Sequence, residues 1–271
     1  IPDEDLWKTH YWLKIKLVDA VRARVRQRWS RDRISTSKVL AGGTLLDPSV
    51  LTVGFARRFA AYKRADLIFR DRERLKRMLN DRWRPLQIIF AGKAHPADDE
   101  GKQILQRVYR MAEDPEMGGR IAFVEDYGEQ FAQYLVHGVD VWLNNPLRPF
   151  EASGTSGMKA ALNGVPQLSI LDGWWAEGYN GKNGWAIGDP TKEYATEAEQ
   201  DADDAESFYQ ILEQEIVPLY YERDAEGIPH GWLDRNKSSI MTLTPMYSTR
   251  RMLRDYCQFY IRAMTADLML A

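Results

Sequence analysis

Short apolar segments alternate with longer amphipathic ones through the middle of the chain. The apolar segments are partly β-branched, and this is typical of strands that are buried on both faces; they are LTVGF (51–55), LQIIF (86–90), IAFV (121–124), VDVWL (139–143) and QLSIL (167–171). Amphipathic stretches at 65–80 and 101–114 separate them and are predicted to be helices. The alternation predicts an α/β fold, in which a parallel sheet has helices on both of its faces.

The chain before the first strand is predicted to be helical. Leu17, Val18, Val21 and Val25 recur at helical spacing within a predicted helix over residues 3–29. The basic residues of this segment interleave with its apolar positions. They are therefore interpreted as a solvated helix face rather than as a binding surface.

The end of the chain has a different composition. An acidic run at 193–206 is predicted to be a solvated connection, and helices are predicted over 204–222 and 246–268. This organisation predicts three parts, which are a helical leader and linker (1–45), a sheet-containing core (46–200) and a helical C-terminal extension that packs on the core (201–271).

The composition narrows the possible partners. The formal net charge of −2 implies no general attraction to nucleic acid or to an anionic membrane. No apolar run approaches the roughly 20 residues that span a bilayer. A single cysteine, Cys257, fits a reducing compartment, so we expect the protein to be cytoplasmic. The four histidines lack the spacing of metal ligands, and no metal site is expected.

One glycine-rich segment, EASGTSGMKAALNG (151–164), is predicted to begin a helix. The free amides at a helix start bind anions, and Thr155 and Ser156 add hydroxyl donors. Lys159 lies four residues after Thr155, about 6 Å further along the helix. This offset suits pyridoxal phosphate, which carries a phosphate at one end and a lysine-reactive aldehyde at the other. From this segment alone, a glycine-rich helix cap followed by a surface lysine is the slightly preferred interpretation.

A second cluster directly follows the first predicted strand. GFARRFAAYKRADL (54–67) contains four cations, Arg57, Arg58, Lys63 and Arg64. If a helix begins within 59–67, Arg58 and Lys63 can face the ligand crevice of the sheet and hold a phosphate dianion. The alternative is a charged helix start, although cations there oppose the helix dipole.

Two other segments carry weaker signals. His95 lies in the loop FAGKAHPADD (90–99), where a histidine could act as a general acid but is more often structural. Trp174, Trp175 and Trp185 could form a stacking platform for sugars, which would make the chain a non-catalytic glucan-binding module. A packing or active-site loop is the preferred interpretation of the tryptophan segment.

Together these segments resemble the α-glucan phosphorylases, the family of glycogen, starch and maltodextrin phosphorylases, and in particular their short bacterial type. The resemblance runs from about residue 45 to 190, and it is carried by GFARRFAAYKR, FAGKAHPAD, EDYGEQFAQYLVHGVDVWLNNPLRPFEASGTSGMK and LNGVPQLSILDGWWAEGYNGKNGWAIGD. It implies the C-terminal, Rossmann-like lobe of a glycosyltransferase-B fold. A full phosphorylase is far longer, so we expect the other lobe to supply much of the sugar site.

The resemblance implies pyridoxal 5′-phosphate as cofactor. Lys159 matches the lysine that holds it, and Thr155 and Ser156 match positions that bind its phosphate. Arg57 matches a basic residue beside that phosphate, and Tyr127 falls where a tyrosine packs at the pyridoxal ring.

The substrate residues are implied in the same way. Arg58 and Lys63 match the pair that binds the reactive inorganic phosphate, so with Lys159 they are the expected catalytic residues. Glu151, Ser153 and Gly154 match positions that hydrogen-bond the glucosyl hydroxyls, so they are the expected substrate-binding residues. The implied reaction is phosphorolysis of an α-1,4-glucan or maltodextrin to glucose 1-phosphate, with the cofactor's phosphate as acid–base partner. The preferred glucan and homo-oligomerisation of the full enzyme are left open.

Two positions qualify the resemblance. Many members have GTGNMK where this chain has GTSGMK, so Gly157 replaces an amide side chain and one hydrogen bond to sugar or cofactor is in question. A nucleotide-sugar glycosyltransferase of the glycogen-synthase kind is the nearest alternative. It would carry a second glutamate eight positions after Glu151, where this chain has Lys159, and this favours the phosphorylase.

Overall fold

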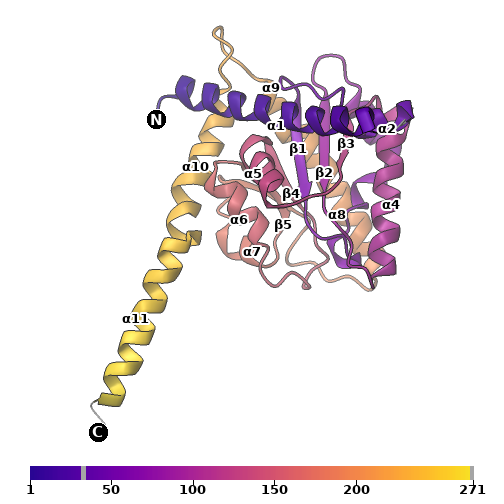
Figure 1. Cartoon of the computed structure of the whole chain (residues 1–271). Coiled ribbons are helices and arrows are strands. Elements are labelled where there is room, and N and C mark those ends of the chain that lie inside the picture. The colour runs from indigo at the N-terminus through magenta and orange to yellow at the C-terminus, as the bar shows by residue number, and fades with distance from the viewer. Residues whose placement is uncertain (32–34, 269–271) are drawn as a thin grey trace.

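The chain folds around one sheet of six parallel strands. A computed structural model describes residues 1–31 and 35–268. The strands are β1 (Leu51–Ala56), β2 (Leu86–Ala91), β3 (Ile121–Val124), β4 (Val141–Asn144), β5 (Gln167–Ile170) and β6 (Gly184–Ile187). Their order across the sheet is β3-β2-β1-β4-β5-β6, and every neighbouring pair is parallel (Figure 1). The predicted α/β fold with a parallel sheet is therefore confirmed.

Helices connect these strands and cover the sheet. They are α1 (Asp3–Arg31), α2 (Thr36–Ala41), α3 (Arg72–Leu79), α4 (Asp99–Glu113), α5 (Glu129–Gly138), α6 (Thr155–Leu162), α7 (Trp174–Gly178), α8 (Glu197–Ile211), α9 (Val217–Tyr221), α10 (His230–Tyr247) and α11 (Thr249–Leu268). Short 3₁₀ turns span Ala61–Lys63, Leu67–Phe69 and Pro115–Met117, and a π-helical turn, Leu212–Ile216, joins α8 to α9. No described helix is long and apolar enough to cross a membrane.

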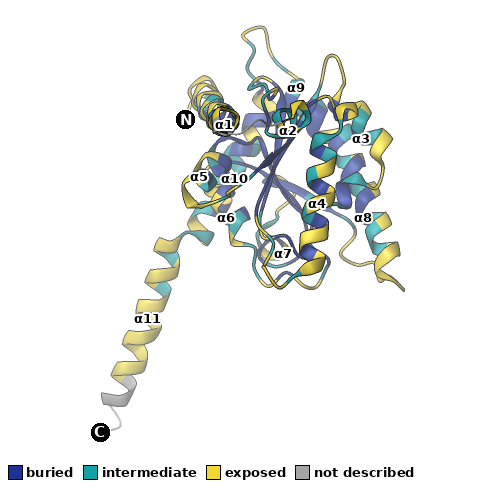
Figure 2. Cartoon of the chain, turned by 45° about the vertical axis from the view of Figure 1, so that its right-hand side comes forward, coloured by how far each residue is buried: buried dark blue, intermediate teal, exposed yellow. Residues whose placement is uncertain are grey.

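Strands β1, β2, β3 and β4 contribute to two separate cores because successive side chains point to opposite faces of the sheet. Ile88 and Phe90 of β2 join a cluster with α3, α4 and α8, whereas Ile89 and Ala91 join a cluster with α1 and α5. Figure 2 shows the buried strands between these two layers of helices. This double burial explains why the strands read as continuous apolar runs rather than as alternating ones.

Helix α1 is anchored to the sheet by a buried charge network. Lys14 and Asp140 are both fully buried and form an ion pair. The Lys14 ammonium also donates to the Val50 carbonyl at 2.6 Å and to the Tyr220 hydroxyl at 2.9 Å. His10 Nε2 lies 2.7 Å from the other Asp140 oxygen. Residues from both ends of the chain thereby meet at the amino ends of β1 and β4.

The C-terminal part departs from the prediction at two places. The acidic run 193–206 was expected to be a solvated connection, but α8 begins at Glu197 and buries Asp204 to 3% exposure. The expectation fails because Asp204 has a buried arginine partner, described below. Helix α10 was not predicted, since its sequence is largely polar and contains Pro245.

The last helix, α11, extends away from the rest of the chain (Figure 1). Many of its apolar side chains are exposed, including Phe259, Tyr260 and Met264. The helices α8, α9 and α10, by contrast, contribute buried residues to the cores. The division of the chain at residues 45 and 200 stays a prediction.

Candidate anion and cofactor site

The strand order fixes where a ligand site can form. Strands β1 and β4 lie side by side at the centre of the sheet, and the chain winds outward from them in opposite directions. At such a switch point, the loops after the two carboxyl ends separate and leave a crevice. Strand β1 ends at Ala56 and β4 at Asn144. The segments 57–64 and 145–159, which contain nearly all the predicted site residues, start at this crevice.

The segment after β1 does not form the helix that was considered for 59–67. It forms the 3₁₀ turn Ala61–Lys63, and Arg64 then adopts a left-handed conformation with φ of +47°. The cations of this segment therefore do not oppose the dipole of an α-helix. Their counter-charge comes from elsewhere in the chain.

That counter-charge is Glu151, from the segment after β4. Its Oε2 accepts a hydrogen bond from Lys63 Nζ at 2.5 Å and another from the Arg57 guanidinium. Burial works to raise the pKa of the Glu151 carboxyl, but the hydrogen bonds and charges of Lys63 and Arg57 outweigh it and lower the pKa. The structure thus joins three predicted residues from both sides of the crevice in one buried ion cluster.

Arg57 has donors left over in this cluster. Its side chain is 8% exposed, and its Nε and Nη1 atoms are buried without a hydrogen-bond partner. Burial lowers the pKa of the Arg57 guanidinium, although Glu151 counteracts the shift. Buried donors without partners are costly, and a bound anion would satisfy them.

An open hollow of about 350 Å³ lies beside Arg57. Arg58, Lys93, His95 and Tyr127 also line it, so cationic and polar groups from the loops after β1, β2 and β3 converge there. The hollow brings together the predicted Arg57, Arg58 and Tyr127. Lys93 was not assigned a role from sequence, but its position two residues after β2 parallels that of Arg58 after β1.

His95 contributes to this hollow mainly as a turn residue. Its Nδ1 accepts a hydrogen bond from the Ala97 amide at 3.1 Å, and its side chain is exposed. The structural interpretation of this histidine is therefore favoured. Among the described residues, no group of three or more His, Cys, Asp or Glu side chains is placed to hold a metal ion.

Helix α6 begins as the glycine-rich segment predicts. Gly154 precedes it in a left-handed conformation with φ of +91°, and no side chain caps the helix. The amides of Thr155 and Ser156 lie in the first turn, where helix geometry provides no backbone partner. Lys159 follows one turn later and is exposed, while the next residue, Ala160, packs in the same cluster as Tyr127. Thr155, Ser156 and Lys159 do not line the hollow beside Arg57.

Asp172 holds the backbone at Glu151 and was not among the site residues predicted from the sequence. Its carboxylate accepts hydrogen bonds from the Glu151 amide at 2.8 Å and from the Gly173 amide at 2.9 Å. Gly173 has a φ of +54°, and a Cβ added there would lie 2.5 Å from the Ser153 carbonyl oxygen. The only available signal was the place of Asp172 just after a strand.

The tryptophan segment packs rather than forming a platform. Trp174, Trp175 and Trp185 are 4%, 0% and 2% exposed, so the stacking platform of a glucan-binding module is not formed by them. A Cβ at Gly157 would lie 2.6 Å from Gln167 Oε1 and 3.0 Å from Trp174 Nε1. The side chains of Gln167 and Trp174 therefore occupy the space where an amide side chain at position 157 would begin.

The fold and the site define a doubly wound α/β protein with a buried ion cluster at its switch point. Residues 19–210 match the family model of the carbohydrate phosphorylases. The chain is 58% identical over 268 residues to a glycogen phosphorylase of Aquifex aeolicus. The aligned region covers 98% of this chain and 38% of that protein. It is 47% identical over 271 residues to a maltodextrin phosphorylase of Thermococcus litoralis, covering 100% of this chain and 31% of that protein.

A glycogen phosphorylase of Mycobacterium tuberculosis is also similar. It is 48% identical over 256 residues, covering 94% of this chain and 29% of that protein. The chain belongs to the carbohydrate phosphorylase family. It spans less than two fifths of the length of these relatives.

Proposed function

We propose that this chain is the cofactor-carrying, C-terminal part of an α-glucan phosphorylase. The full enzyme would cleave an α-1,4-glucan or maltodextrin with inorganic phosphate and release glucose 1-phosphate. The proposal is supported by family membership and by the ion cluster of Arg57, Lys63 and Glu151 at the switch point. The cluster is the single observation that carries it.

The cluster supports phosphate chemistry on electrostatic grounds. Arg57 and Lys63 share one carboxylate, and Arg58 and Lys93 lie at the adjoining hollow, so cations outnumber the counter-charge. Two phosphate groups held side by side repel each other strongly where water is excluded, and they require such a surplus of positive charge. A surface helix start would have no use for buried, unpaired guanidinium donors.

The same residues fit pyridoxal phosphate as cofactor. Lys159 would hold it covalently, the first-turn amides and hydroxyls of Thr155 and Ser156 would bind its phosphate, and Arg57 would direct its unpaired donors at that anion. Tyr127 would pack at the ring. When bound, the cofactor supplies a phosphate group that exchanges a proton with the substrate phosphate.

Glu151 would have two successive roles, first as the counter-charge of Arg57 and Lys63 and then as a hydrogen-bond acceptor for the sugar. It balances Arg57 and Lys63 in the chain described here. An inorganic phosphate bound by Arg58 and Lys63 would compete with it for the Lys63 ammonium. The released carboxylate oxygen could then accept a hydrogen bond from a glucosyl hydroxyl, with Ser153 and Gly154 at the same sugar.

The proposal is tested with the full-length protein. Maltodextrin and inorganic phosphate should yield glucose 1-phosphate, and omission of phosphate should abolish the product. Incorporation of sugar from a nucleotide-sugar donor without phosphorolysis would instead indicate a synthase-like glycosyltransferase. Binding of maltodextrin with neither reaction would indicate a binding module, and either result would overturn the proposal.

A further inference from the structure

Arg64 is the residue in the site region that the proposed chemistry leaves without a role. It has a φ of +47° and a ψ of +46°, and among the described non-glycine residues only Asp126 shares a positive φ. This left-handed conformation costs a residue with a Cβ about 1–2 kcal/mol. The side chain of Arg64 is nevertheless buried, with 7% exposure. A strained, buried arginine persists only where its surroundings hold it firmly.

The surroundings of Arg64 do so by hydrogen bonds on every side. Its Nε donates to the Asn145 carbonyl at 3.0 Å, and Nη2 donates to the Pro146 carbonyl at 2.8 Å. Nη1 and Nη2 also donate to Asp201 and Asp204, each at 2.8 Å. In return, the Arg64 carbonyl accepts from the Asn145 side-chain amide at 2.8 Å. In contrast to Arg57, no buried nitrogen of this guanidinium lacks a partner.

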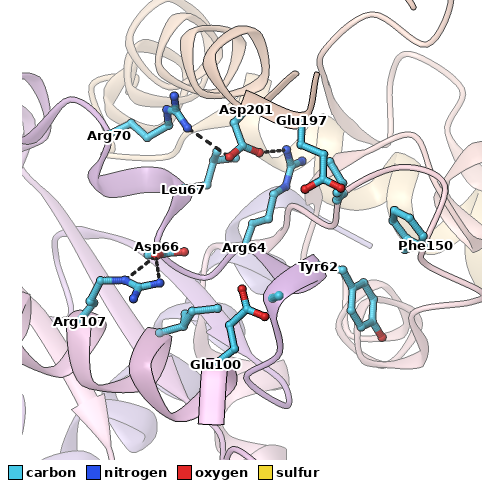
Figure 3. A pocket seen from close by; sticks show the side chains of 13 residues that line it. Tyr62, Arg64, Asp66, Leu67, Arg70, Glu100, Arg107, Phe150, Glu197 and Asp201 are labelled. Atoms are coloured by element: carbon cyan, nitrogen blue, oxygen red, sulfur yellow. Dashed lines mark hydrogen bonds and ion pairs between the residues drawn. The ribbon is translucent and has the colours of Figure 1, made fainter. Parts of the chain in front are cut away.

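These bonds join three parts of the chain that are distant in sequence. The backbone of Arg64 continues from Lys63, and the Leu147 amide donates to the Tyr62 carbonyl at 2.7 Å. The segment with Lys63 is thereby fixed to the segment that leads to Glu151, its ion-pair partner. The third part is α8, whose Asp201 and Asp204 carboxylates accept hydrogen bonds from Arg64. Figure 3 shows Arg64 and Arg70 on either side of Asp201.

We propose that Arg64, held by Asp204, is a positioning residue that sets Lys63 for the reactive phosphate. The inference rests on the proposed function. The left-handed turn at Arg64 determines the direction in which the preceding residue presents its ammonium, and the four bonds of the guanidinium keep that turn in place. Lysine at this position could keep the charge but could not reach two carbonyls and two carboxylates with one ammonium group.

Arg70 provides a matched control. It also bonds to Asp201, at 3.1 Å, but its side chain is 42% exposed and no bond to the 145–146 carbonyls is formed by it. The paired variants are therefore Arg64→Lys and Arg70→Lys, made in the full-length enzyme with its cofactor. Both conserve charge, and both alter a partner of the same aspartate.

The first measurement is the Michaelis constant for each substrate. In Arg64→Lys, KM for phosphate should rise about tenfold. The variant loses guanidinium hydrogen bonds that hold the turn at residue 64, and Lys63 is then less well oriented. The KM for maltodextrin and the bound cofactor per chain should stay within about twofold of the wild type. Arg70→Lys should leave both KM values unchanged. Equal rises in both KM values for Arg64→Lys, or no rise for phosphate, would overturn the inference.

The second measurement needs no turnover. Calorimetric titration of the holoenzyme with inorganic phosphate should show a dissociation constant about tenfold higher for Arg64→Lys. If the wild type binds phosphate but releases no glucose 1-phosphate, the proposed function fails, while this comparison still decides the role of Arg64. An unchanged dissociation constant would refute the positioning role.

A second pair of variants guards against misfolding. Asp204→Asn keeps the size of the side chain but removes the buried charge that faces Arg64, and Asp203→Asn changes the neighbouring residue, whose partners are Lys192 and Tyr194. If Arg64→Lys does not fold, Asp204→Asn should still show a several-fold rise in the phosphate dissociation constant. Identical values for Asp204→Asn and Asp203→Asn would contradict the proposal.

Discussion

Replacing Glu151 with glutamine should destabilise the chain and make its stability depend on phosphate. Glu151 is the carboxylate partner of both Arg57 and Lys63, and the three side chains are only 6–8% exposed. The amide of glutamine can still accept hydrogen bonds but carries no charge. Two buried cations would then face each other without a counter-ion.

The magnitude follows from the burial of this cluster. Removing one partner of a buried ion pair costs about 3–5 kcal/mol, because the remaining charge is left uncompensated. The Glu151 pKa is lowered rather than raised, so the folded chain favours the charged form of this carboxyl despite its burial. In domains of about 150–250 residues, a loss of 1 kcal/mol in the free energy of unfolding lowers the melting temperature by about 2–4 °C. We therefore expect Glu151→Gln to melt about 6 °C or more below the wild type.

Thermal unfolding of the 271-residue chain, with and without inorganic phosphate, tests this reasoning. Phosphate should raise the melting temperature of Glu151→Gln more than that of the wild type, since an anion replaces the lost counter-charge. Glu193→Gln, an exposed glutamate, is the control and should melt as the wild type does in both buffers. A Glu151→Gln chain that melts like the wild type, or one that gains no more from phosphate, would refute the electrostatic account of the ion cluster.

Four further outcomes follow from the same structure. The pKa of Glu151 is lowered in the folded chain, so its stabilising contribution should be present above the ordinary glutamate pKa of about 4.3. This contribution should be lost as the pH falls through the folded pKa. An acid titration that shows the same loss of stability in Glu151→Gln would contradict this. Asp140→Asn should lower the free energy of unfolding by about 3–5 kcal/mol in a denaturant titration, because Lys14 would be left buried without its counter-charge. Arg58→Ala and Lys63→Ala in the full enzyme should each lose most phosphorolysis while keeping their cofactor, and unchanged turnover at saturating phosphate would count against the assigned role. The 271-residue chain alone should bind pyridoxal phosphate but form no glucose 1-phosphate from maltodextrin, since the sugar would lack the second wall of its crevice; robust turnover would show that the site is misplaced.

The sheet could be predicted because burial on both faces leaves a direct mark on the sequence. Strand β3 coincides with the predicted IAFV, since each of its four residues is buried. Strand β6 escaped prediction because it is short, begins at a glycine and follows the turn-rich NGKN (180–183). Helix α10 escaped for a similar reason, because only a few of its residues are buried and many of the others are polar.

The candidate site was predictable where function depends on local sequence. The glycine before α6 and the cations after β1 stand in compact motifs, so they could be chosen as candidates without knowledge of the fold. The contacts that organise them are not local. Arg64 meets Asp204 across 140 residues, and Glu151 meets Lys63 across 88. No periodicity or motif encodes such pairs, and the acidic run of α8 therefore resembled a solvated linker until its partner was placed.

The most direct test of the central claim is covalent labelling of Lys159. The full-length protein is incubated with pyridoxal phosphate, reduced with borohydride and digested, and the modified peptide is mapped by mass spectrometry. Lys159→Ala should lose the label, whereas Lys182→Ala, which removes another exposed lysine, should keep it. The account predicts one pyridoxyl group per chain, on Lys159. Label at a different lysine, or none on a folded wild-type protein, would contradict it.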